Sequence, residues 1–293
     1  MRKLKILRTL ENGSSGKNIS NTFPSMKLSI ITINYNNLEG LKRTYESVAC
    51  QTSRAFEWII IDGGSTDGSR EFIVEHQDKF AYWCSELDKG IYNAMNKGIA
   101  HASGEYLQFL NSGDGLHDQE VIKGFYELTN DEDIIAGDIA LDGFMEQVLC
   151  SPDDSELDYD YMRFSTVRHS AAFIKRSLFE AYGGYDESFR IVSDWKFFLE
   201  VLIKYNCSYS HWHRVVSDFN TEGISERSDT YELRMMERQK VYEDFLPRYN
   251  KTLKKRDRRI KELDIPLIPF IKRKLYWKYK KLSLLFSRKT GSK

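Results

Sequence analysis

Apolar runs and helically spaced apolar residues alternate along the first half of the chain. The runs are rich in β-branched residues and end at turn residues, which predicts buried strands at 28–33, 56–61, 80–84 and 105–110. Apolar positions three and four apart lie between them, which predicts helices at 38–48, 72–76 and 90–102. We therefore expect repeated β-α units in a mostly parallel sheet with helices on both faces.

The pattern is less regular beyond residue 133. A turn at Asp142-Gly143 between two apolar segments predicts a strand pair over 133–148. Further along we expect a strand at 169–174, a helix at 193–205, and a long charged helix at 230–263 that is interrupted near Pro247.

The composition fits a folded protein and excludes several other classes. The 293 residues are 41% hydrophobic and 13% aromatic, enough for one large domain or two small ones. No apolar run approaches the roughly 20 residues that cross a bilayer, and no internal period indicates a repeat architecture. The four cysteines lie far apart in the sequence, so we expect reduced thiols in a cytosolic protein rather than disulfides or a structural zinc site.

The net charge of zero hides a strong asymmetry. Residues 251–293 hold 16 Lys and Arg but 3 Asp and Glu, a charge of +13, so residues 1–250 carry −13. An acidic body with a basic tail predicts a separate anionic partner for the tail. At the other end, residues 1–25 are polar and loop-like and lack the apolar core of a signal peptide, so we interpret them as a flexible extension.

Polar and Gly-rich segments follow all four predicted strands of the first half. In an open α/β sheet, ligands bind at the carboxyl ends of the strands, and carboxylates there suit ribose hydroxyls, base N–H groups and a divalent metal. Neither a GxGxxG fingerprint nor a GxxxxGK[ST] phosphate loop is present. The segments are Asn34-Tyr35-Asn36-Asn37, 62–69, Asp88-Lys89-Gly90 and Asn111-Ser112-Gly113-Asp114.

The stretches SIITINYNN, WIIIDGGSTDGS and DKGIYNAMNKGIAHASGEYLQFLNSGD resemble family 2 glycosyltransferases of the GT-A fold, of the type that builds bacterial capsule, exopolysaccharide or O-antigen. The resemblance covers about residues 27–225. It implies a GT-A catalytic domain at 26–229, with a nucleotide-sugar half at 26–115 and an acceptor half at 116–229, followed by a helical basic extension at 230–293.

The resemblance implies inverting transfer from a nucleotide-diphosphate sugar, and UDP is the commonest nucleotide in the family. It places Asn34 and Tyr35 beside the nucleoside, Asp62 facing the base, and Asp88 and the helix that begins at Gly90 along the ribose and diphosphate. The predicted nucleotide-sugar site also includes Asn36, Lys89, Asn96 and Asn111. A helix beginning after Gly90 favours anions at its N-terminus. The alternative for Asp88 is a helix cap.

The metal motif departs from the family pattern. Family members commonly carry Asp-x-Asp after the fourth strand, whereas this chain has one carboxylate, Asp114, in that segment. One carboxylate with diphosphate oxygens and water can still hold Mn²⁺ or Mg²⁺, with Asn111 as a weak neutral contact. The alternative is a tight turn without a metal.

The acceptor half of the resembling enzymes carries a general base after a Gly-Gly-aromatic-Asp-Glu loop. By that resemblance Asp194 takes the proton of the acceptor hydroxyl. Its alternatives are a helix cap at Asp194, or a base at Asp186 or Glu187 in the same loop as Gly184. His169 matches a histidine that touches the diphosphate or orients the acceptor, and it can equally be an ordinary hydrogen-bonded side chain.

Two further segments complete the sequence picture. Residues 218–225 resemble a loop that closes over the donor and excludes water. We interpret His211-Trp212-His213 as an alternating strand rather than a metal site.

The basic tail mixes lysines with leucines and aromatic residues, a composition that suits an anionic membrane surface. We therefore expect a cytoplasmic enzyme, peripheral on the inner face of the membrane, acting on a saccharide or lipid-linked acceptor. A solvated helix or a contact in a homo-oligomer is the alternative for the tail. The alternative functions are a sugar nucleotidyltransferase and a nucleotide-sugar-binding protein without transfer activity, and we expect no nucleic-acid partner.

Overall fold

The computed structural model describes residues 28–245 except 130, 142–146, 222 and 224–227, together with 247, 251 and 255. The chain divides into two compact units, Met1–Thr221 and Glu222–Lys293. Among the described residues, the second unit holds a one-turn 3₁₀ segment (Ser228–Thr230) and α8 (Tyr231–Asp244). The predicted extension 1–25, the turn at Asp142-Gly143 and the tail beyond 255 lie outside the described residues.

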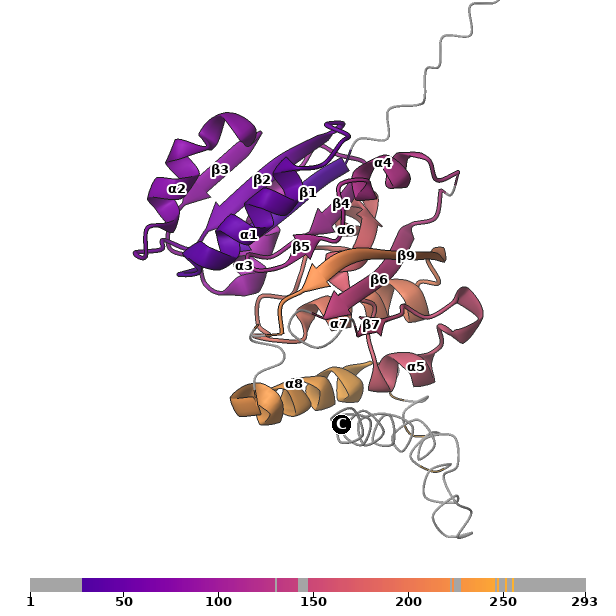
Figure 1. Cartoon of the computed structure of the whole chain (residues 1–293). Helices are drawn as coiled ribbons and strands as arrows, with labels where there is room; N and C mark the ends of the chain where they lie inside the picture. The colour runs from indigo at the N-terminus through magenta and orange to yellow at the C-terminus, as the bar shows by residue number, and fades with distance from the viewer. Residues whose placement is uncertain are drawn as a thin grey trace, which may run out of the picture. The chain divides into compact units, whose positions relative to one another are not determined.

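Four parallel strands form the first half of the sheet in the first unit (Figure 1). Their order is β3-β2-β1-β4, and each pair in this series is parallel. The strands are β1 (Leu28–Asn34), β2 (Phe56–Asp62), β3 (Tyr82–Ser85) and β4 (Tyr106–Phe109). They confirm the four strands expected from the apolar runs.

Helices cover both faces of these strands. Leu28 and Ile30 of β1 pack in one cluster with Leu41 and Val48 of α1 (Leu38–Ala49), and this cluster also includes Ile73 of α2 (Ser69–Glu75). The opposite face meets α3 (Ile91–His101), where a side chain on Gly98 would collide with Ile31. Burial on both faces explains why β1 is continuously apolar instead of alternating.

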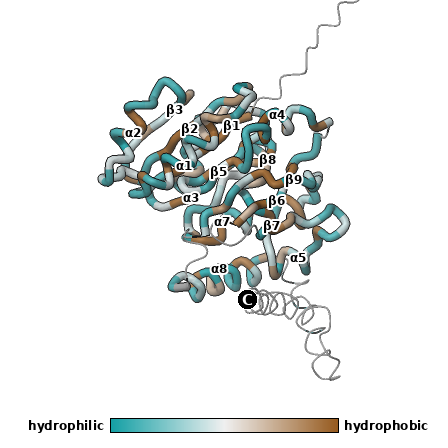
Figure 2. The backbone as a smooth tube through the Cα atoms, in the orientation of Figure 1, coloured by the Kyte–Doolittle hydropathy of each residue, from teal (hydrophilic) through white to brown (hydrophobic). Residues whose placement is uncertain are grey.

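The second half of the sheet is mixed. Beyond β4 the order continues β8-β6-β9-β5, with β8 antiparallel to both β4 and β6, and β6 parallel to β9. Figure 2 shows hydrophobic residues concentrated along strands such as β6 and β8. The strands are β5 (Gly115–Leu116), β6 (Ile134–Leu141), β7 (Val148–Leu149, paired with β6), β8 (Ala172–Lys175) and β9 (Tyr209–Phe219).

Short helices connect these strands. One departs from the sequence prediction: α7 (Ser193–Phe198) continues as a π-helical segment (Leu199–Lys204). The others are α4 (Val121–Tyr126), α5 (Tyr159–Phe164) and α6 (Arg176–Tyr182), with 3₁₀ turns at Gln77–Lys79, Asp154–Glu156 and His169–Ala171. Among the described helices, none has the length and apolar character that crossing a bilayer requires.

The predicted fold class is confirmed as an α/β architecture with a central sheet between helices. The strand expected at 169–174 begins only at Ala172, because His169–Ala171 form a 3₁₀ turn. The predicted strand pair over 133–148 is found as β6 and β7. The carboxyl ends of β1, β2 and β3 lie in register, with Asn34 opposite Asp62 and Asp62 opposite Ser85. This edge of the sheet carries residues that the sequence analysis predicts to bind the nucleotide sugar.

Candidate active site

Asp62 organises the ends of the three neighbouring strands. Its Oδ1 accepts hydrogen bonds from Asn34 Nδ2 (2.8 Å) and Ser65 Oγ (2.5 Å), and its Oδ2 accepts from Ser65 N (3.0 Å) and Ser85 Oγ (2.6 Å). A carboxylate offers about four lone-pair directions, so these contacts occupy its acceptor capacity. The fully buried Asp62 therefore fixes the shape of this edge.

Asn34 keeps one polar atom without a partner. Its side chain is 3% exposed, and its Oδ1 accepts no hydrogen bond from the described residues. A buried carbonyl oxygen without a donor is costly, which favours a ligand N–H at this point. Asn36 holds the adjoining loop, because its Oδ1 accepts from Thr66 N at 2.9 Å and its own N donates to Ser65 Oγ at 2.7 Å.

Tyr35 and Asp88 meet over Gly63. A Cβ atom on Gly63 would lie 2.6 Å from Asp88 Oδ2 and 3.1 Å from the Tyr35 ring, so a side chain there would have to displace the Asp88 carboxylate. The Tyr35 side chain is exposed, which leaves its ring face open to a planar group. The structure thus brings together an aromatic ring and a carboxylate that the sequence separates by 53 positions.

Asp88 also shapes the start of α3. Its Oδ1 accepts from Gly90 N at 2.8 Å, and Lys89 N donates to Asn93 Oδ1 at 3.2 Å. Gly90 has φ of 119°, a conformation that side chains disfavour. Asp88 therefore supports the turn into the helix while its second oxygen faces Tyr35, so the structural and binding interpretations are compatible.

Asn96, Gly184 and Glu187 join α3 to the loop before α7. Asn96 Nδ2 donates to Tyr185 O (2.8 Å) and Glu187 Oε1 (2.9 Å), and Asn96 Oδ1 accepts from Tyr185 N (2.8 Å). A Cβ on Gly184 would lie 2.5 Å from Asn96 Oδ1. These predicted site residues are in contact with one another, and their polar groups connect the two halves of the sequence.

Asp194 lies at the start of α7 between two hydrogen-bonding partners. Tyr92 Oη donates to its Oδ1 at 2.8 Å, and His169 Nδ1 lies 3.1 Å from its Oδ2. Burial raises the pKa of Asp194, but the hydrogen bond and charge of His169, together with the Tyr92 hydroxyl, lower it further, so the pKa is below its usual value. Asp194 is therefore ionised at neutral pH.

His169 links Asp194 to the end of β4. Its Nε2 lies 3.2 Å from Asn111 Nδ2, which can only donate, so Nδ1 carries the hydrogen toward Asp194. Burial lowers the pKa of His169, while the hydrogen bond and charge of Asp194 and the charge of Asp114 raise it above the usual value. The 3₁₀ turn that displaces the start of β8 is what places this imidazole beside Asp194.

Asp114 is a buried carboxylate with little compensation. It is 4% exposed and its Oδ1 accepts from Asn220 N at 2.9 Å. Burial raises its pKa to about 6, against smaller lowering contributions from this backbone hydrogen bond and the charges of His169 and Arg43. Nearby, Asn111 Oδ1 is buried and accepts no hydrogen bond from the part of the chain that the structure describes.

These two oxygen donors fit a hard divalent cation. Mg²⁺ and Mn²⁺ prefer carboxylate and carbonyl oxygens, and Mg²⁺ is often held by one or two carboxylates with substrate phosphates and water. A cation would neutralise Asp114 and engage Asn111 Oδ1.

Asp186 and Glu187 are both engaged elsewhere. Asp186 accepts from Lys196 Nζ at 2.8 Å and from Ser188 N at 3.0 Å. Burial raises the pKa of Asp186, but these hydrogen bonds and the Lys196 charge lower it to about 2. Glu187 accepts from two asparagine amides, Asn93 and Asn96, at 2.9 Å each.

Sequence reasoning missed Tyr92, Ser65, Ser85 and the Asn220 backbone. Tyr92 is 4% exposed and lies on the buried side of α3. Serines in turns and backbone N–H groups carry no sequence signal of their own, since their partners are set by the fold.

Comparison with known proteins identifies the family. Residues 29–183 match glycosyl transferase family 2, which is more than half of the chain. An uncharacterised glycosyltransferase of Mycobacterium tuberculosis is 36% identical over 204 residues, covering 67% of this chain and 76% of the relative. The chain belongs to glycosyl transferase family 2. This enzyme is therefore a glycosyltransferase, as the sequence predicted.

Other relatives agree with this assignment. A PGL/p-HBAD biosynthesis glycosyltransferase of Mycobacterium bovis is 27% identical to the glycosyltransferase over 210 residues, covering 67% of this chain and 77% of the relative. The crystal structure of Staphylococcus aureus TarS with UDP-GlcNAc superposes with a TM-score of 0.60 at 18% identity, covering 74% of this chain and 67% of that one. A further TarS structure matches with a TM-score of 0.57, and the chain spans 66% of it, just under two thirds. These structures confirm the GT-A fold.

Proposed function

We propose that this glycosyltransferase moves a sugar, with inversion, from a UDP-sugar to a saccharide or lipid-linked acceptor in the synthesis of a bacterial surface polysaccharide. The observation that carries the proposal is the buried, ionised Asp194, held by Tyr92 and His169 and connected through His169 to Asn111 at the end of β4. TarS, of the same fold, binds UDP-GlcNAc, which supports UDP as the nucleotide.

The base and ribose are bound at the ends of β1 and β2 in this proposal. Asn34 Oδ1 accepts an N–H group of the base, because it is buried and has no donor among the described residues. Asp62 already accepts four hydrogen bonds from Asn34, Ser65 and Ser85. Its role is therefore to hold these residues in place around the base rather than to bind the base by itself. Tyr35 packs on the planar base, and Asp88 accepts from the ribose hydroxyls.

The diphosphate is placed between the start of α3 and Asp114. Unpaired N–H groups at a helix N-terminus attract anions, and α3 is 11 residues long. Asp114 and Asn111 would hold Mn²⁺ or Mg²⁺, and the ion would supply positive charge beside the diphosphate. His169 lies between this region and Asp194, and it connects Asn111 at the end of β4 to that carboxylate.

Asp194 is the general base for the transfer. It accepts the proton of the acceptor hydroxyl while that oxygen forms a bond to the anomeric carbon and the bond to the UDP oxygen breaks. Attack from the face opposite the nucleotide inverts the anomeric configuration. Asp186 is less suitable, because its charge is paired with Lys196 and its pKa is lowered to about 2. Glu187 accepts from Asn93 and Asn96 of α3, whereas Asp194 is connected through His169 to Asn111 at the end of β4.

The loop 218–225 and the basic tail extend this proposal. Asn220 contacts Asp114 through its backbone, so movement of this loop would reach the metal ligand directly. Residues 222 and 224–227 and the tail beyond 255 lie outside the described residues. The membrane role of the tail, the cytoplasmic location and the homo-oligomer alternative remain sequence predictions, testable by vesicle co-sedimentation of the full chain and a chain truncated after Asp264.

A panel of nucleotide sugars tests the donor. We expect UDP-sugars with Mn²⁺ to raise the melting temperature and to be slowly hydrolysed, and EDTA to remove both effects. An Asn34→Asp variant, which keeps the shape but adds a charge beside Asp62, should bind UDP much more weakly. Stabilisation by GDP- or dTDP-sugars alone would contradict the UDP assignment, and stabilisation by none would contradict donor binding.

A further inference from the structure

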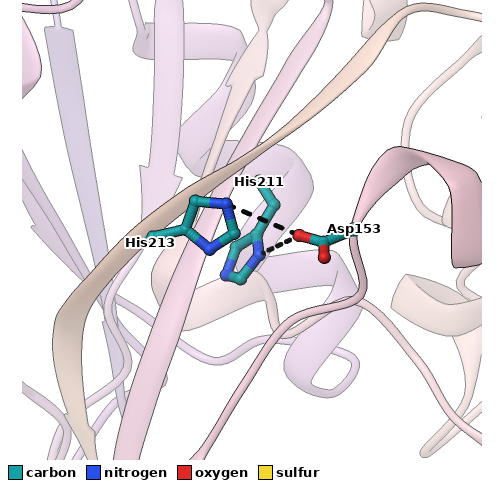
Figure 3. Close-up of side chains that lie close together, drawn as sticks. All are labelled: Asp153, His211 and His213. Atoms are coloured by element: carbon teal, nitrogen blue, oxygen red, sulfur yellow. Dashed lines mark hydrogen bonds and ion pairs between the residues drawn. The ribbon is translucent and has the colours of Figure 1, made fainter.

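Two histidines of β9 lie close to two aspartates, Asp138 of β6 and Asp153. Asp153 precedes the 3₁₀ turn Asp154–Glu156, and its Oδ1 lies 2.9 Å from His211 Nδ1 and 3.6 Å from His213 Nε2 (Figure 3). His211 Nε2 lies 2.7 Å from Asp138 Oδ1 on β6. One ligand atom from each of Asp153, His211 and His213 falls within 4.8 Å of the others.

His211 and His213 lie two residues apart on β9, so both imidazoles lie on the same face of the strand. The pairing with β6 is irregular beside them: Ala136 pairs with His211, but Asp138 pairs with Val215, so β9 holds extra residues between these two pairs. Gly137 lies against this part of β9, since a Cβ there would be 2.8 Å from Arg214 O.

Both ring nitrogens of His211 face a carboxylate oxygen, and its side chain is only 6% exposed. Nε2 faces Asp138, which leaves Nδ1 as the nitrogen that could bind an ion. Nδ1 lies beside Asp153 Oδ1, and His213 Nε2 lies near the same oxygen, so the three atoms are close enough to bind one ion.

We propose that Asp153, His211 and His213 bind a divalent transition-metal ion of the Zn²⁺ class, with Asp138 orienting His211. Two imidazoles and a carboxylate are a common donor set for Zn²⁺, whose ligand atoms in a tetrahedral site lie about 3.4 Å apart. Asp138 then accepts Nε2–H of the metal-bound imidazole, and its Oδ1 is itself fixed by Ser151 N at 2.9 Å. His213 is 74% exposed, so its ring can move the short distance that closes the site.

This site is separate from the cation site at Asp114. His211 lies near the beginning of β9, and Asn220, which contacts Asp114, follows the end of that strand. Nine residues of strand separate them by roughly 30 Å along the chain. The ion would fasten the segment before α5 to the sheet, and it would take no part in sugar transfer.

Metal titration of the full chain, stripped with EDTA and free of nucleotide, tests the proposal. Co²⁺ should give the visible absorption of a tetrahedral site containing nitrogen ligands, and Zn²⁺ should displace it and raise the melting temperature. His213→Ala should weaken Zn²⁺ binding at least tenfold without unfolding the protein, because the side chain is exposed. Asp138→Asn should weaken it by about 10- to 100-fold.

His117→Ala is the matched control. His117 Nδ1 lies 2.6 Å from Asp218 Oδ1, and both side chains are partly exposed. Among the described residues, this pair does not belong to a group of three or more His, Cys, Asp or Glu side chains that could hold a metal ion. This variant should bind Zn²⁺ as the wild type does. Absence of the Co²⁺ absorption in the wild type, or unchanged Zn²⁺ affinity in His213→Ala, would overturn the proposal.

Discussion

Replacing Asp114 with asparagine should stabilise the metal-free glycosyltransferase at neutral pH while removing the proposed carboxylate ligand of the metal. Asp114 is 4% exposed, and burial raises its pKa from 3.8 to about 6. The folded protein therefore favours the protonated carboxyl, and ionising it destabilises the fold. Asparagine keeps the shape and the oxygen that accepts from Asn220 N, but it carries no charge.

The size of the effect follows from the pKa shift. A difference of about two pKa units corresponds to roughly 3 kcal/mol in the free energy of unfolding. Because the folded pKa lies above the unfolded one, the wild type has its full relative stability below pH 3.8 and loses it as the pH rises through about 6. The variant should therefore equal the wild type near pH 3.8 and exceed it by up to roughly 3 kcal/mol above pH 7.

Urea unfolding of both proteins between pH 4 and 8, with EDTA present, measures this difference. Asp186→Asn is a control of opposite sign, because the folded pKa of Asp186 is lowered to about 2 and its charge stabilises the fold at neutral pH. Added Mn²⁺ and UDP should stabilise the wild type but not Asp114→Asn. A variant that is less stable than the wild type above pH 7 would refute the reasoning.

The remaining predictions concern packing and pH. Gly63→Ala should weaken UDP binding about tenfold in calorimetry, because its Cβ would push Asp88 and the Tyr35 ring apart. Unchanged affinity would show that Asp88 and Tyr35 do not bind the nucleotide. Gly98→Ala should lower the free energy of unfolding by about 1–3 kcal/mol despite the better helix propensity of alanine, since its Cβ would meet Ile31 at 2.4 Å; a more stable variant in urea would contradict this. The stability difference between wild type and His169→Gln should be largest between pH 4 and 6.5, because the contribution of Asp194 is lost toward acid pH and that of His169 as the pH rises through its raised pKa; a pH-independent difference would contradict the ion pair.

The sequence predicts the strand ends that carry Asn34 and Asp62 well, because local signals determine them. Apolar runs end at Asn34 and Asp62, and the carboxyl ends of parallel strands meet, so these two side chains had to be neighbours. The long stretches that resemble family 2 glycosyltransferases then predicted the reaction, which is sugar transfer. The strand and helix positions of the first half needed no tertiary information, since burial on both faces leaves a continuous apolar run.

Contacts between residues that lie far apart in the sequence could not be predicted. The hydrogen bond from Tyr92 to Asp194 joins residues 102 positions apart. Nothing in the helical pattern of α3 indicates that the Tyr92 hydroxyl donates to Asp194. His169 was expected at the start of a strand, but a 3₁₀ turn sets its direction. His211 and His213 lie on a strand as expected, and their spacing places both on one face, but no sequence pattern indicates that this face meets Asp153, 58 residues earlier in the chain.

The kinetics of Asp194→Asn test the central claim most directly. We expect the rate of sugar transfer to fall by about 10² to 10⁴, because asparagine cannot accept the hydroxyl proton. The dissociation constant for UDP should stay the same, and the matched variant Asp186→Asn should keep far more activity, since its carboxylate is held by Lys196. Transfer by Asp194→Asn within a few-fold of the wild-type rate would contradict the assignment of Asp194 as the base.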